Sequence, residues 1–166
     1  MGKTIVLAVD TARRELAQHV AAAVEMTKDV AHADDTVIVL HVHEFAVGRF
    51  GRIQVDCAEG QGESLVASIV EDLRRSGLTA KGVISDADNG FVARAILLAA
   101  RHHQARLLVL GSSSRTDLPW VPFGSVANRL LHIASLPVLI VPMRPAEAVP
   151  EAAAEAAPVT EAAPAG

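Results

Sequence analysis

One segment of the chain combines the residue types that could hold an anion. It contains a glycine, three consecutive hydroxyl side chains and a glycine-serine pair: Gly111, Ser112, Ser113, Ser114, Gly124 and Ser125. Glycine lets the backbone turn sharply and aim successive N–H groups at one point, and a helix that starts at Ser125 adds unpaired N–H groups and a favourable dipole. The pattern predicts a phosphate-binding turn. The alternative is that Gly111 only ends a strand and Ser125 only caps a helix.

A carboxylate follows the first apolar run of the chain. Asp10 comes directly after Ala8 and Val9. Ligands of open α/β sheets bind beyond the carboxyl ends of the strands, where Asp10 could accept a hydrogen bond from a ligand hydroxyl or amino group. Capping of the first helix would explain the same residue equally well.

Two histidines and two aspartates have spacings that could suit a metal ion. His41 and His43 are two apart on a predicted strand and share a face, with Glu44 adjacent, while Asp86 and Asp88 follow another predicted strand. Structural roles explain the histidines better, and turn and cap roles explain the aspartates. We therefore expect no metal site.

Nucleophilic catalysis has little support. The serines at 112–114, a histidine and Asp10 could supply a nucleophile and a base, but no nucleophile-elbow sequence surrounds the serines. Cys57 is interpreted as a solvent-exposed residue without special reactivity. We expect a protein that is not an enzyme.

The charge balance and the cysteine count exclude several classes of partner. Residues 146–166 hold four of the 19 acidic side chains and no basic one, which leaves 15 acidic residues against 15 basic ones in the body. Such a body lacks the basic surface that nucleic-acid binding normally requires. No apolar run approaches the roughly 18 residues of a membrane span, so no membrane partner is expected. A single cysteine forms no intramolecular disulfide and fits a cytoplasmic location.

Apolar periodicity predicts the elements that position these residues. Strands are expected at 4–9, 36–42, 79–85, 106–110 and 137–141, and helices at 12–33, 62–76, 90–103 and 125–134. Continuous aliphatic strands are typical of a parallel sheet that is buried on both faces. The alternation predicts a doubly wound α/β fold with a five-stranded parallel sheet and helices on both faces.

Two segments fall outside this alternation. Residues 146–166 are rich in Ala, Pro and Glu, and are expected to form a disordered tail after an α/β domain at 1–145. The connection from 43 to 61 is unusually long and contains three glycines. It is interpreted as a candidate lid.

The glycine-containing segment resembles the signature of the universal stress protein family. Gly111, two residues, Ser114, nine residues and Gly124-Ser125 stand where the family has Gly, two residues, Gly, nine residues and Gly-Ser or Gly-Thr. The likeness extends to residues 5–10, 40–42 and 136–142, and thus covers about residues 3–142. It implies a sheet of strand order 3-2-1-4-5, with a crevice between the first and fourth strands.

The resemblance also implies an adenine-nucleotide site. Ala8, Val9 and Asp10 resemble the segment that lines the nucleoside end, and Val42 resembles the position whose backbone meets adenine. The two halves of the phosphate turn would be Gly111, Ser112, Ser113 and Ser114, and then Gly124, Ser125 and Val126.

Two departures from the family pattern bear on the ligand. Ser114 stands where ATP-binding members usually have glycine, and a side chain on a left-handed backbone costs roughly 1–2 kcal/mol. The loop that follows offers Arg115 as its one base, so a triphosphate would be poorly neutralised. AMP, cyclic AMP, or ATP that carries its own Mg²⁺ are the expected ligands.

Taken together, the residues and the resemblance predict a cytoplasmic module that binds an adenine nucleotide in a stress response, with at most trace ATPase activity. The alternative is a nucleotide-free interaction protein of the same fold. The apolar last strand, around 138–141, is expected at a sheet edge, which is prone to association. Members of the family commonly dimerise there, so a homodimer is expected.

Overall fold

The structure, a computed structural model, describes residues 2–11, 17–49, 51–112 and 124–142. The elements follow in the order β1 (Thr4–Val9), α1 (Ala17–Val30), β2 (Thr36–Gly48), β3 (Gly51–Gln54), α2 (Gln61–Arg75), β4 (Thr79–Asp88), α3 (Val92–His102), β5 (Ala105–Ser112), α4 (Gly124–Ile133) and β6 (Val138–Pro142). No helix in these ranges has the length and apolar character needed to cross a membrane.

Five of these strands form a parallel sheet in the order β4-β2-β1-β5-β6. Counted along the chain, these five have the order 3-2-1-4-5, which confirms the predicted doubly wound fold. The central strand β1 lies between β2 and β5, with Val6 opposite Ile38 on one side and opposite Leu108 on the other. The winding direction therefore reverses between β1 and β5.

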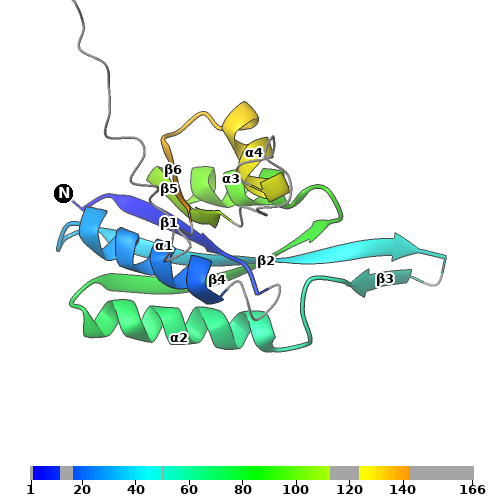
Figure 1. Cartoon of the computed structure of the whole chain (residues 1–166), viewed down its shortest axis with the longest axis horizontal. Helices are drawn as coiled ribbons and strands as arrows, with labels where there is room; N and C mark the ends of the chain where they lie inside the picture. The colour runs from blue at the N-terminus through cyan, green and yellow to red at the C-terminus, as the bar shows by residue number, and fades with distance from the viewer. Residues whose placement is uncertain (1, 12–16, 50, 113–123, 143–166) are drawn as a thin grey trace, which may run out of the picture.

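The prediction of a purely parallel, five-stranded sheet was wrong at one place. β2 continues well past its expected end at Val42, and β3 returns beside it in antiparallel register, with Gly48 opposite Gly51. Gly51 has a φ of 122°, which favours glycine. The long connection at 43–61, interpreted as a candidate lid, has regular structure of its own. The end of β2 and the strand β3 form a β-hairpin there that projects from the sheet (Figure 1).

The register shows which edge of β2 this hairpin occupies. Phe45 pairs with Gln54 of β3 and with Asp88 of β4, so β3 and β4 flank β2 on opposite edges. β1 occupies the edge opposite β4, but its pairing with β2 ends where Val9 faces His41. β3 therefore lies on the edge that β1 leaves open, and the chain after β3 returns toward the carboxyl end of β1.

Alternate residues of the strands build two apolar layers, one on each face of the sheet. Ile5 and Leu7 belong to the layer covered by α1 and α2, while Val6 belongs to the layer covered by α3 and α4. The two helix pairs lie on opposite sides of the sheet in Figure 1. Both faces are buried, as the continuous aliphatic strands predicted.

Candidate functional site

A pocket of about 180 Å³ lies at the carboxyl ends of the central strands. Its lining includes most of the residues predicted to bind a nucleotide, namely Ala8, Val9, Asp10, Val42, Gly111, Gly124, Ser125 and Val126. Ser112 is fully buried at the end of β5 and is not part of the lining. Ser113 and Ser114 fall outside the described residues.

Strand register brings the two halves of this site together. Ala8 of β1 pairs with Leu110 of β5, so Asp10, which follows β1, and Gly111, which is the second-last residue of β5, lie at the carboxyl ends of adjacent strands. The winding direction reverses between these strands, which is where ligands bind in open α/β sheets. α4 begins at the same edge with Gly124, whose φ is 69°.

The lining of the pocket contains both apolar and acidic residues. Leu40 and Ile96 are among its apolar members, and Asp10, Glu44 and Asp56 are its acidic members. The described part of the lining contains no lysine or arginine. Such a surface is suited to accept hydrogen bonds from hydroxyl and amino groups, and the first turn of α4 supplies the N–H groups that an anion needs.

A buried histidine completes one wall of the pocket. His19 of α1 is only 6% exposed, and burial lowers the pKa of its imidazole. Its Nδ1 has no hydrogen-bond partner among the described residues. His19 was not predicted as a site residue, because the sequence alone does not show that α1 lies against the end of β5.

The universal stress protein family model matches residues 1–142. The chain belongs to the universal stress protein family. Three solved structures illustrate how far its fold agrees with that of other universal stress proteins. The Archaeoglobus fulgidus protein in complex with dAMP is 19% identical, with a TM-score of 0.58 over 84% of this chain and 97% of that chain.

The other two structures contain related nucleotides. The Arabidopsis thaliana protein with AMP bound is 16% identical, with a TM-score of 0.61 over 86% of this chain and 92% of that chain. A universal stress protein in complex with cAMP is 15% identical, with a TM-score of 0.61 over 84% of this chain and 96% of that chain. At these identities the likeness shows a shared fold. No curated protein matches the chain.

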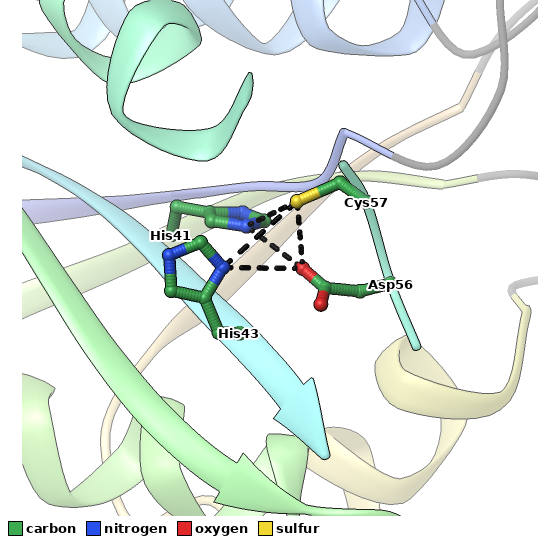
Figure 2. A group of neighbouring side chains, drawn as sticks. All are labelled: His41, His43, Asp56 and Cys57. Carbon is green, nitrogen blue, oxygen red and sulfur yellow. Dashed lines mark hydrogen bonds and ion pairs between the residues drawn. The ribbon is translucent and has the colours of Figure 1, made fainter. Parts of the chain in front are cut away.

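A second group of polar side chains lies beside the pocket, at the open edge of β2. It consists of His41 and His43 on β2 and of Asp56 and Cys57, which follow β3 (Figure 2). The expectation that Cys57 is solvent-exposed was wrong. Its Sγ donates to Asp56 Oδ2 over 3.2 Å and lies 3.8 Å from His41 Nε2, and burial raises the pKa of its thiol.

The sequence contained one signal of this group, the two histidines that share a face of a strand. Asp56 and Cys57 were missed as their neighbours because residues 43–61 were interpreted as a lid, and a lid has no defined place against the sheet. The hairpin and its return supply that place.

Proposed function

We propose that this universal stress protein is an adenine-nucleotide-binding module of a stress response. The observation that carries the proposal is the pocket at the reversal point of the sheet, where β1, β2, β5 and α4 together contribute Ala8, Val9, Asp10, Val42, Gly111, Gly124, Ser125 and Val126. The dAMP, AMP and cAMP complexes of proteins with the same fold support an adenine nucleotide as the ligand.

The pocket geometry suggests how each part of the nucleotide is held. At about 180 Å³ the pocket is smaller than the roughly 300–1,000 Å³ of most ligand sites, so we infer that it encloses only part of the nucleotide. The base occupies the apolar interior near Val42, and a ribose hydroxyl donates to Asp10. The phosphate lies at the mouth of the pocket, against the first turn of α4. We assign no catalytic step to this pocket.

The charges around the pocket favour a ligand with few negative charges. Three carboxylates in the lining would repel a triphosphate, and no described lining residue is a lysine or arginine to offset them. AMP or cyclic AMP is therefore preferred over free ATP. ATP would bind with its own Mg²⁺, which neutralises part of its charge.

The test begins with the ligand content of the purified full chain. Denaturing extraction followed by mass spectrometry should detect an adenine nucleotide, or calorimetric titration with AMP, cyclic AMP and Mg²⁺-ATP should give saturable binding. GMP is the control for recognition of the base. If none of the adenine nucleotides binds at millimolar concentration, the proposal fails and the nucleotide-free interaction role replaces it.

The interaction role is favoured by a separate observation on β6. Within the described residues β6 pairs only with β5, and Val138, Leu139 and Ile140 are partly exposed. An unpaired apolar edge strand is a site for association. We propose that two copies of the chain form a homodimer through this edge, with or without a nucleotide.

A further inference from the structure

We propose that His41, His43, Asp56 and Cys57 form a binding site for one divalent transition-metal ion, with Zn²⁺ as the preferred ion. The donor atoms are His41 Nε2, His43 Nδ1, Asp56 Oδ2 and Cys57 Sγ, which all lie within 4.8 Å of one another. Figure 2 shows the four side chains converging from two segments of the chain. Imidazole, thiolate and carboxylate are the ligands that Zn²⁺ takes in proteins, whereas Mg²⁺ and Ca²⁺ prefer oxygen ligands alone.

The spacing of the donors fits a tetrahedral ion. Asp56 Oδ2 lies 3.1 Å from His41 Nε2, 3.5 Å from His43 Nδ1 and 3.2 Å from Cys57 Sγ. Cys57 Sγ lies 3.8 Å from His41 Nε2 and 3.9 Å from His43 Nδ1. Bonds of about 2.0–2.3 Å to a tetrahedral Zn²⁺ hold its donors roughly 3.3–3.8 Å apart. These five distances need only small shifts to admit the ion. The sixth pair, His41 Nε2 and His43 Nδ1, lies within 4.8 Å, and the two rings would move toward the tetrahedral separation when the ion binds.

Hydrogen bonds hold both imidazoles with a ring nitrogen toward the group. His41 Nδ1 lies 3.0 Å from the carbonyl oxygen of Val9, and because a carbonyl only accepts, Nδ1 carries the proton. In the neutral ring the lone pair of Nε2 then faces Asp56 Oδ2, which is also an acceptor. A cation between these two acceptors would bind the lone pairs of both. His43 Nε2 donates to Glu63 Oε1 over 3.2 Å, and such outer partners are typical of metal-bound histidines.

The two histidines of the group are buried, Cys57 is half-buried, and the fold leaves room for the four side chains. The side chains of His41, His43 and Asp56 are 1%, 8% and 6% exposed. Helix α2 approaches the two rings at Gly62, where a Cβ would lie 2.3 Å from His41 Cδ2 and 2.8 Å from His43 Cε1. A glycine at this position lets the helix cover the group without displacing either ring.

One side chain competes with the ion for these donors. Gln54 Nε2 donates to His43 Nδ1 over 2.8 Å and to Cys57 Sγ over 3.3 Å. Its amide therefore occupies the lone pairs that a metal would take, and it must turn away when the ion binds. Since Gln54 ends the short strand β3, its side chain can move without disturbing the central sheet.

A bound ion would affect the neighbouring pocket. It would tie Asp56 and Cys57 to β2, and Asp56 is part of the pocket lining. The ion would thereby fix one wall of the proposed nucleotide site. The metal site itself does not depend on that site, because its donors are complete without a nucleotide.

The direct test is a titration of the untagged full chain, stripped of metal, with Co²⁺ as a spectroscopic probe. We expect one Co²⁺ per chain, the visible absorption of a tetrahedral complex, a sulfur-to-cobalt charge-transfer band, and displacement by Zn²⁺.

Cys57→Ser should abolish the charge-transfer band, and His43→Ala should weaken binding at least about 100-fold. Gln54→Ala should bind equally well or better. The matched control is the double variant His102→Ala/His103→Ala, which removes two adjacent histidines elsewhere and should leave binding unchanged.

A second measurement uses the wild-type protein alone, so it does not depend on how the variants fold. Because Cys57 is the single cysteine of the chain, alkylation by iodoacetamide reports on that thiol only. Zn²⁺ at one equivalent should slow alkylation at least tenfold, and Mg²⁺ should have no effect. If no ion binds at micromolar concentration, or if Zn²⁺ leaves the alkylation rate unchanged, the proposal is overturned and the four residues form a hydrogen-bonded cluster without a metal ion. Neither result decides whether a nucleotide binds to this protein, which calorimetry measures separately.

Discussion

Gly111 at the end of β5 lies directly against the backbone of His19 in α1. A Cβ at position 111 would be 2.7 Å from the carbonyl oxygen of His19 and 3.0 Å from its carbonyl carbon. Real Cβ atoms do not approach backbone this closely, so glycine is required here by helix packing alone. This packing role against α1 was not among the roles predicted for Gly111, and it applies whether or not a phosphate also binds there.

We predict that Gly111→Ala destabilises the fold by about 1–3 kcal/mol, since α1 must move away from β5 to accept the methyl group. The free energy of unfolding from urea denaturation measures the effect. Gly48→Ala is the matched control, because the nearest atom to its Cβ would be 3.8 Å away, and it should change stability by less than about 0.5 kcal/mol. Equal stability of the two variants would contradict the packing role.

The phosphate position is tested by a charge at Gly124. Its φ of 69° strains any other residue, so Gly124→Ala measures the strain and Gly124→Asp adds a carboxylate where the phosphate is proposed to lie. We expect Gly124→Asp to bind AMP at least tenfold more weakly than Gly124→Ala, because like charges repel. Calorimetry on both folded variants gives the ratio. Equal affinities would place the phosphate elsewhere.

Acid stability depends on a buried carboxylate far from the pocket. Burial alone would raise the pKa of Asp35, but hydrogen bonds from Arg106, from His32 and from Lys3 hold that pKa well below its usual range. A lowered folded pKa stabilises the protein above the unfolded pKa of about 3.9, and this contribution is lost as the pH falls below that value. We expect the free energy of unfolding to drop on acidification from pH 5 to pH 3.

Removal of this carboxylate should abolish most of that pH dependence. Asp35→Asn should cost about 3 kcal/mol at pH 7, because the partly buried Arg106 guanidinium, 2.7 Å from Asp35 Oδ2, loses its charged partner and keeps only a neutral one, the carbonyl oxygen of Val30, among the described residues. The exposed Asp29 provides the control, and Asp29→Asn should change stability by less than about 0.5 kcal/mol. An unchanged acid transition in Asp35→Asn would refute the assignment.

Association through β6 has a simple measurement. Light scattering of the full chain at micromolar concentration should give a mass near twice 17.4 kDa. The reason is that the partly exposed aliphatic residues of β6 are paired on one edge only within the described residues. A mass near 17.4 kDa at this concentration would rule out the homodimer.

The local elements were predictable because each one is encoded in a short stretch of sequence. The bounds of β1 are those expected from its apolar run. The continuous aliphatic character of β1 and β2 predicted a sheet that is buried on both faces. The glycine-serine pair at 124–125 marked the beginning of α4. The strand order came from the family resemblance, since local patterns do not specify which strands are neighbours.

Tertiary structure alone decided what the long connection after Val42 does. β1 ends opposite His41, which leaves the rest of that edge of β2 without a partner, and β3 pairs there. The return of the chain then places Asp56 and Cys57 beside His41 and His43. No local sequence pattern encodes the proximity of these four residues, because it depends on where β1 stops pairing with β2.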